Sequence, residues 1–284
     1  MDNHVIFDDL FFEYFCHSIF YKMTKVLIFT DSRGEHKATF KDQPIFTEKI
    51  SVMLQDKGVV VDKMCCPFSW TSTLDFIEII EKKFIDLDSY DKIILFTGVV
   101  EFSPRPLSNF EKCYQPENFS EITFERLVDV KRTKGRIINN KQDFMTQFIS
   151  PKLLQQHLDS THHVYYDGED TRSLISLDIN KQVIIPYLKK LDSKLIYINS
   201  NSIVPNWEGN YILKNKLGRP KNIHIISDYS KQMLNQFTHI IDLLEWTDEE
   251  IKTYTVDNMH LSYEGSEWIF NKLIEILQLI EILQ

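Results

Sequence analysis

The sequence predicts an α/β fold whose parallel sheet is covered by helices on both faces. Short apolar runs rich in β-branched residues alternate with longer segments whose apolar residues recur every three or four positions. Such alternation is typical of parallel strands joined by right-handed helical crossovers. Two of the runs end in short glycine-containing motifs, as buried parallel strands do where a functional loop follows.

The first predicted strand, Lys25 to Thr30 (KVLIFT), is apolar, β-branched and followed at once by Asp31. The same pattern predicts strands at 59–64, 91–97 and 194–199, and more weakly at 239–244. In open parallel sheets the chemistry lies beyond the carboxyl ends of the strands. Ser32 and Gly98 are therefore both expected at the functional edge.

Helices are predicted where apolar residues form one stripe at helical spacing. The predicted helices cover 46–57, 73–85 and 261–284, and their stripes consist, in that order, of Ile50, Met53 and Leu54; of Leu74, Ile77, Ile80 and Phe84; and of Trp268, Ile269, Leu273, Ile276 and Leu277.

Residues 23–284 are expected to form a single domain that carries a large insertion after the third strand, at about 103–185. The insertion is polar and rich in loops, with helical spacing around 144–158, and we interpret it as a lid or a specificity element. Residues 1–22 form an aromatic extension, predicted to be a helix that packs on the body or on a second copy of the chain in a homo-oligomer.

The composition of the chain argues against several classes of function and of site. The formal net charge of −9 argues against nucleic acid as a general partner, because phosphate binding needs a basic surface. The basic clusters at 131–136 and 214–221 are interpreted as solvated loops. The four cysteines lack the spacing of a zinc site, so no metal is expected. No transmembrane segment and no secretory signal is recognised, and a cytoplasmic location is expected.

Two short segments carry the candidate chemistry. Ser32 follows the first strand on a turn with Arg33 and Gly34, and Asp257 and His260 stand three residues apart just before the last helix. A serine hydroxyl becomes a nucleophile when an imidazole takes its proton, and a carboxylate orients that imidazole. The three residues predict a Ser-His-Asp triad, with turn amides near Ser32 as oxyanion donors.

On these residues the chain resembles the SGNH, or GDSL-type, hydrolase superfamily. The first block of that family is matched in part by residues 29–33, with Thr30 where glycine is usual, and the last block in full by residues 257–265. The resemblance implies a three-layer α/β/α sandwich of flavodoxin-like character. It also implies that Ser32 is the nucleophile, His260 the general base and Asp257 its orienting acid, with no cofactor required.

The middle blocks depart from the family pattern. The second block lacks its glycine at 67–72, and the third reads Gly98-Val99-Val100-Glu101, with valine in place of asparagine. Compensation is expected from the Arg105 guanidinium, with an ion pair to Glu101 as the structural alternative, or from a hydroxyl. The candidate oxyanion or substrate-binding residues are accordingly Arg33, Gly98, Glu101, Arg105, Ser69, Thr71 and Ser72.

Further polar residues suggest a substrate. Aromatic and acidic side chains at 165–172, with Trp207 and Tyr211, would suit a carbohydrate subsite, and the basic loop at 214–221 would suit an anionic glycan or the phosphates of coenzyme A. His162 and His163 are adjacent, so on an extended segment they face opposite sides, which disfavours a shared metal.

Three functions follow as hypotheses. The first is a serine esterase that removes acyl groups, most plausibly acetyl, from a carbohydrate or polysaccharide. The second is an O-acetyltransferase that uses the same triad with acetyl-CoA as co-substrate. The third is a non-catalytic glycan-binding protein on a decayed fold, motivated by the altered middle blocks.

Overall fold

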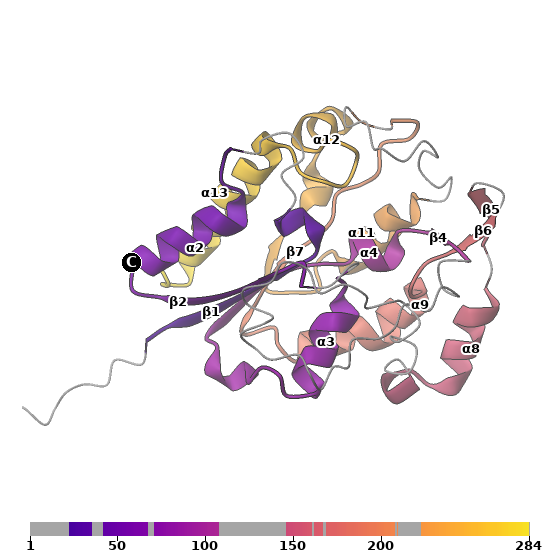
Figure 1. Ribbon diagram of the computed structural model, residues 1–284, viewed down its shortest axis with the longest axis horizontal. Helices are drawn as coiled ribbons and strands as arrows, with labels where there is room; N and C mark the ends of the chain where they lie inside the picture. Colours follow the sequence, from indigo (N-terminus) through magenta and orange to yellow (C-terminus); the bar gives the residue numbers. More distant parts are fainter. Residues whose placement is uncertain are drawn as a thin grey trace, which may run out of the picture.

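The computed structural model describes residues 23–35, 42–67, 71–107, 146–160, 162–166, 169–207, 209 and 223–283 (Figure 1), with the backbone alone for 162–166. The predicted extension at 1–22, the stretch 108–145 of the predicted insertion, Ser69, Tyr211 and the basic loop at 214–221 lie outside these residues. The predictions about them, including the homo-oligomer, stay predictions. Within the described part of the chain, no helix has the length and apolar character needed to cross a membrane.

The centre of the fold is a five-stranded sheet in the order β2-β1-β3-β7-β8. Its strands are β1 (Lys25–Thr30), β2 (Val60–Cys65), β3 (Lys92–Phe96), β7 (Leu195–Ile198) and β8 (His239–Ile241), and all neighbouring pairs are parallel. Counted along the chain, these strands lie in the order 2-1-3-4-5, which is the flavodoxin-like arrangement. The fold class predicted from the sequence is thus confirmed.

The side chains of β1 show why the sheet has a helix layer on each face. Val26 and Ile28 face a core formed with α2 (Phe46–Asp56) and α13 (Tyr263–Leu279). Leu27 and Phe29 face the opposite core, formed with α3 (Thr73–Glu81) and α11 (Ile225–Met233). Figure 1 shows α2 and α13 together on one side of the sheet and α3 on the other. Because all four β1 residues are fully buried, the strand is uniformly apolar rather than alternating.

The predicted elements shift slightly in the structure. The weak strand expected at 239–244 is limited to β8, because Asp242 accepts the N–H of Leu244 and caps the 3-10 helix η5 (Leu243–Glu245). The last helix begins at Tyr263, where Ser262 accepts the N–H of Gly265 as its N-cap. Its apolar stripe enters the core as expected, with Ile269, Leu273 and Leu277 fully buried.

The described part of the segment between β3 and β7 contains structure that the sequence pattern did not reveal. A small antiparallel sheet has the order β4-β6-β5, with β4 (Arg105–Pro106), β5 (His162–Tyr166) and β6 (Glu169–Arg172). Helix α4 (Val99–Phe102) precedes it and α8 (Pro151–Asp159) lies beside it. Next come α9 (Leu177–Ile179), a π-helical stretch η4 (Asn180–Ile184) and α10 (Ile185–Lys189). Their apolar residues join the core that covers α3.

Candidate active site

Ser32 lies on a short 3-10 helix, η1 (Ser32–Gly34), directly beyond the carboxyl end of β1. Asp31 caps this turn by accepting the backbone N–H of Arg33 at 2.9 Å, and its own N–H donates to the carbonyl of Phe96 on the neighbouring strand at 2.9 Å. A Cβ at Gly34 would overlap the Thr30 side chain, so the turn can close only with glycine. Within the described residues the backbone N–H of Ser32 makes no hydrogen bond.

Asp257 and His260 lie on a loop whose ends are held together. Thr255 and Leu261 form an antiparallel bridge, and the N–H of Val256 donates to the carbonyl of His260 at 2.8 Å. Between them Asn258 has a φ of +69°, a left-handed conformation that asparagine tolerates better than most residues. The loop therefore turns Asp257 and His260 toward each other.

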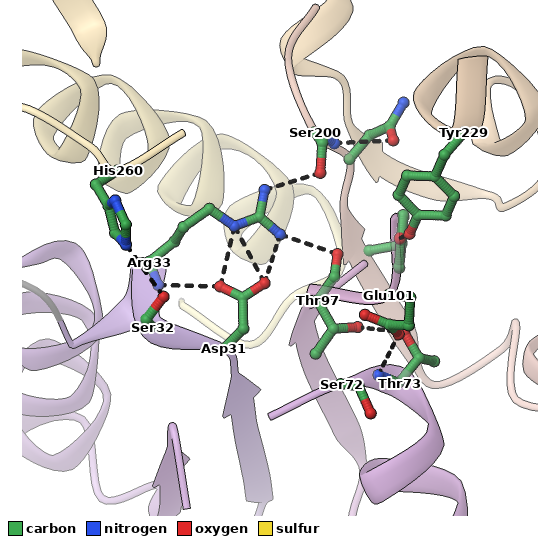
Figure 2. A network of polar contacts seen from close by, with 12 residues as sticks. Asp31, Ser32, Arg33, Ser72, Thr73, Thr97, Glu101, Ser200, Tyr229 and His260 are labelled. Atoms are coloured by element: carbon green, nitrogen blue, oxygen red, sulfur yellow. Dashed lines mark hydrogen bonds and ion pairs between the residues drawn. The ribbon is translucent and has the colours of Figure 1, made fainter. Parts of the chain in front are cut away.

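The structure brings the three predicted triad residues together, and Figure 2 shows two of them, Ser32 and His260. The ring Nδ1 of His260 lies 2.9 Å from Asp257 Oδ2, and its Nε2 lies 3.3 Å from Ser32 Oγ. A carboxylate can only accept, so Nδ1 carries the proton and Nε2 is left to accept the proton of the serine hydroxyl. Asp257 is fully buried, whereas the His260 side chain is about 20% exposed. The imidazole is thus partly open to solvent, whereas the carboxylate that orients it is not.

Arg33, which the sequence suggested as a substrate-binding residue, is buried inside the protein. Its side chain is 1% exposed and forms an ion pair with Asp31 at 2.8 Å. The other terminal nitrogen donates to Ser200 Oγ at 2.8 Å, and the guanidinium lies 3.8 Å from the centroid of the Phe96 ring. Each nitrogen of the guanidinium donates inside the protein. Arg33 therefore supports the turn from beneath instead of facing a ligand.

Gly98 lies two residues beyond β3, at the N-cap of α4, and has a φ of +109°. A Cβ here would overlap the ring and hydroxyl of Tyr229, which stacks on Phe102 with ring centroids 4.3 Å apart. Gly98 is needed both for its backbone conformation and for this close contact. Its N–H makes no hydrogen bond within the described residues, and it follows the strand that pairs with the one before Ser32.

Glu101 is also turned into the protein. Its side chain is 1% exposed and accepts the backbone N–H of Thr73 at the start of α3. The hydroxyls of Thr73 and Thr97 lie 2.8 Å apart, so the end of β3 and the start of α3 are joined by side chains (Figure 2). Glu101 therefore connects the segment 98–101, the third block of the family pattern, to the start of α3.

The remaining sequence candidates divide into buried and more exposed residues. Thr71 and Ser72 are fully buried, and Ser72 caps α3 by accepting the N–H of Asp75. Arg105 is half-buried on β4, opposite Arg172 in the pairing register. Among the described residues no group of histidine, cysteine, aspartate and glutamate side chains is arranged to hold a metal ion.

Sequence reasoning missed a set of polar residues that follows β7. Ser200 and Asn201 are 0% and 2% exposed, and both bond to the loops that carry the triad. The signal was present in the sequence, since Asn199-Ser200-Asn201 comes directly after a buried parallel strand, where functional loops begin.

No protein-family model matches the sequence, and no curated protein does so. Among solved structures, the chain is similar to a lipase/acylhydrolase from Enterococcus faecalis, with 11% identity over 90% of this chain and 95% of the other and a TM-score of 0.47. A possible lipase from Chitinophaga pinensis is 11% identical over 91% and 99% of the chains, with a TM-score of 0.43.

A third similar structure, from Parabacteroides merdae and provisionally assigned as a GDSL-like lipase, is 11% identical over 89% and 94% of the chains, with a TM-score of 0.41. These identities and TM-scores carry no inference about the activity of this chain. Its fold class rests on the strand order and the two helix layers, and its chemistry on the residues at the carboxyl edge of the sheet.

Proposed function

We propose that the protein is a serine esterase that cleaves acyl esters through Ser32, His260 and Asp257. The observation that carries this proposal is the continuous series of contacts from Asp257 Oδ2 to His260 Nδ1 at 2.9 Å and from His260 Nε2 to Ser32 Oγ at 3.3 Å. Ser32 and His260 are 228 residues apart in the sequence. Their meeting at the carboxyl edge of the sheet, beside a buried carboxylate, is the arrangement that activates a serine hydroxyl.

The reaction follows from this geometry. Ser32 Oγ attacks the ester carbonyl carbon while its proton passes to His260 Nε2, and Asp257 stabilises the imidazolium that forms. The tetrahedral intermediate then breaks its carbon–oxygen bond to the alcohol, which leaves with the proton from Nε2. Water next attacks the acyl-Ser32 ester by the same steps and releases the acid. The distance of 3.3 Å between Ser32 Oγ and His260 Nε2 needs only a small shortening for proton transfer, and catalytic hydrogen bonds tighten in this way as the transition state forms.

For the oxyanion we propose backbone N–H donors, because this chain lacks the second-block glycine and the third-block asparagine of the family pattern. The N–H groups of Ser32 and Gly98 stand at the ends of neighbouring strands, and neither is engaged within the described residues. Val100 offers no side-chain donor. Thr71 is fully buried and is the weaker candidate, while Ser69 and Arg105 stay candidates from the sequence. Preorganised amides of this kind stabilise the developing negative charge.

The proposal is tested with a fluorophosphonate probe and an aryl acetate. Wild-type protein should be labelled at Ser32, as located by peptide mass spectrometry, and should release the aryl alcohol. Ser32→Ala should lose both reactions, whereas Ser89→Ala, at a partly exposed serine before β3, should keep both. Wild-type protein that neither reacts with the probe nor cleaves any aryl ester would contradict the esterase and support a non-catalytic protein.

For the substrate we propose an acetyl ester on a carbohydrate. Trp207 supports this because its carbonyl accepts Asn258 Nδ2 at 2.5 Å, which places the residue beside the loop that carries His260. Its side chain is only partly buried against the core on the α2 and α13 side of the sheet. Trp207→Ala should raise KM for acetylated oligosaccharides and leave KM for a small aryl acetate nearly unchanged. Equal effects on both substrates would argue against a sugar contact at Trp207.

The acetyltransferase stays the alternative that uses the same acyl-Ser32 intermediate. Wild-type protein is incubated with acetyl-CoA and candidate glycans, and free thiol and acetylated glycan are both measured. Thiol release without glycan product indicates hydrolysis, whereas the two in equal amounts indicate transfer. In either case Ser32→Ala should abolish the reaction.

A further inference from the structure

Two consecutive residues after β7 bond to the two separate loops that carry the triad. Ser200 accepts a hydrogen bond from Arg33, whose backbone follows Ser32. Asn201 donates one to the carbonyl of Asn258, which stands between Asp257 and His260. One short segment therefore touches both the nucleophile turn and the histidine loop, although the chemistry described above uses neither residue.

The contact with the nucleophile turn is made through a buried ion pair. Arg33 donates to Ser200 Oγ at 2.8 Å and to the carboxylate of Asp31 at 2.8 Å. The same carboxylate accepts the backbone N–H of Arg33, so the residues before and after Ser32 are both fixed. Figure 2 shows the guanidinium reaching from the turn toward Ser200. A shift of Ser200 would thus be transmitted to the position of Ser32 Oγ.

The contact with the histidine loop uses the amide of Asn201 and all of the Asn258 side chain. Asn201 Nδ2 lies 2.9 Å from the carbonyl of Asn258. Asn258 in turn accepts the N–H of Val204 at 2.8 Å and donates to its carbonyl at 3.3 Å. These bonds join the loop that follows β7 to the turn that holds the His260 ring. Asn201 and Asn258 are 2% and 3% exposed, so water does not replace these bonds easily.

The segment that makes both contacts is itself fixed to the sheet. Its first residue, Asn199, accepts the N–H of Ser200 at 2.9 Å. Its amide donates to the carbonyl of Ser230 and to Asp242, each at 2.9 Å. Asn199 is fully buried. The segment is therefore held between β7, α11 and the end of β8, and is rigid enough to position what it touches.

We propose that the segment Asn199–Asn201 is a brace that sets the distance between Ser32 Oγ and His260 Nε2, with Asn201, Ser200 and Arg33 as positioning residues. The inference rests on the proposed function, because it deepens the account of the same triad. None of these positioning residues touches the reacting atoms. Each acts through the placement of Ser32 or His260.

The test measures the distance-dependent interaction itself and needs no substrate. In a Ser32→Cys variant the new thiol lies beside His260, and an imidazolium within a few ångström lowers the pKa of a thiol well below its ordinary value of about 8.5. Iodoacetamide alkylation of that thiol is followed against pH, with the modified peptide quantified by mass spectrometry. The thiolate displaces iodide and forms a carbon–sulfur bond, so the rate reports the thiolate fraction. The native cysteines give separate peptides.

Adding Asn201→Ala to Ser32→Cys is expected to raise the apparent pKa of the new thiol by about one unit, since an opposite charge loses much of its effect as the separation grows. The matched control is Asn180→Ala, which removes another buried amide, one that donates to Gln232 at 3.1 Å. This control should lower stability and leave the pKa of the thiol unchanged. Ser200→Ala removes a single hydroxyl and serves as the milder variant if Asn201→Ala does not fold.

An unchanged thiol pKa in both Asn201→Ala and Ser200→Ala would overturn the brace while leaving the esterase standing. The brace would be supported if the thiol pKa is low in Ser32→Cys and rises when Asn201→Ala or Ser200→Ala is added. If the wild-type protein nevertheless hydrolyses no ester, the brace would stand and the proposed function would be contradicted. In the active wild-type background, Asn201→Ala should lower kcat about 10-fold or more with a small change in KM. An ordinary thiol pKa in Ser32→Cys alone would overturn the brace, because His260 would then not act on the group at position 32, and aryl acetate hydrolysis by the wild type would decide the esterase separately.

Discussion

Asp257 holds His260 at two points. Its Oδ1 accepts the backbone N–H of His260 at 2.7 Å and its Oδ2 lies 2.9 Å from the ring Nδ1. The first bond fixes where the residue stands in the loop, and the second fixes the tautomer and orientation of the ring. The two tasks of the carboxylate are thus divided between its two oxygen atoms, which makes them separable by substitution.

Asp257→Asn is expected to keep the loop and lose the chemistry. An amide oxygen can still accept the backbone N–H, but the amide nitrogen then faces Nδ1 and favours the tautomer whose Nε2 carries the proton. That imidazole cannot take a proton from Ser32, so kcat on an aryl acetate at pH 7 should fall by about 10⁴-fold. Thermal unfolding should change much less than in Asp257→Ala, which loses both bonds. A variant with near wild-type kcat would show that Asp257 does not orient the base.

Gly98→Ala is expected to destabilise the protein by about 2–4 kcal/mol, because it combines backbone strain with overlap against the buried Tyr229 ring. Gly58→Ala separates these effects. Gly58 also has a positive φ, of 78°, but a Cβ there would meet nothing within 4 Å, so its cost should be near 1 kcal/mol. Denaturant unfolding measures both. Equal losses in the two variants would show that the contact with Tyr229 is not tight.

The central sheet was predictable because each of its strands is marked by a local run of apolar, β-branched residues. The run from Lys25 to Thr30 must be buried on both faces to be stable, and a parallel sheet between helix layers is the arrangement that achieves this. The small sheet of β4, β6 and β5 was not predictable in the same way. β4 is two residues long and pairs with β6 across a long stretch of chain, so no local periodicity marks it. β5 and β6 are neighbours in the sequence, and the Asp167-Gly168 pair between them is a hairpin signal that a search for apolar periodicity passes over.

The triad was predictable for a related reason. Ser32 follows directly after a strand, and Asp257 and His260 share one short segment, so a local pattern describes each part. The role of Arg33 was not. Its guanidinium is committed to Asp31, Ser200 and the carbonyl of Thr97, and two of these partners come from distant segments. A one-dimensional pattern shows an arginine beside a serine, but not the side of the turn on which its charge is neutralised.

Alkaline conditions should destabilise the protein through Cys65. Burial raises the pKa of this thiol, which contacts Thr30 and Thr47, to about 11 from 9.0. The folded state keeps the proton that the unfolded state loses, so the stabilisation is complete below pH 9 and is lost as pH rises toward 11. The slope is at most about 1.4 kcal/mol per pH unit. Burial also raises the pKa of Tyr197 and Tyr229, which adds to the loss only above pH 10.

The measurement is the free energy of unfolding of wild type and Cys65→Ala at several pH values between 7 and 10.5. The two curves should run parallel up to about pH 8.5 and then converge, because only the wild type loses the contribution of the thiol. Curves that stay parallel through pH 10 would show that Cys65 does not titrate on unfolding.

The N-cap of α13 should connect the stability of that helix to catalysis. Ser262 stands two residues after His260. It accepts the N–H of Gly265 at 3.2 Å and donates to the carbonyl of Thr253 at 2.7 Å. Ser262→Ala should cost about 1 kcal/mol, as the loss of a serine cap typically does. It should also lower kcat several-fold, because it loosens the C-terminal end of the loop that holds His260.

Ser150→Ala is the matched control, since Ser150 is the N-cap of α8, accepts the N–H of Leu153 at 3.4 Å and makes no hydrogen bond to the triad loops in the described part of the chain. It should lower the free energy of unfolding by up to about 1 kcal/mol with kcat unchanged. Both variants are measured by denaturant unfolding and by aryl acetate hydrolysis at 25 °C. If Ser262→Ala lowers stability like the control and leaves kcat at the wild-type value, the bridge between Thr255 and Leu261 is sufficient to hold His260 without the helix cap.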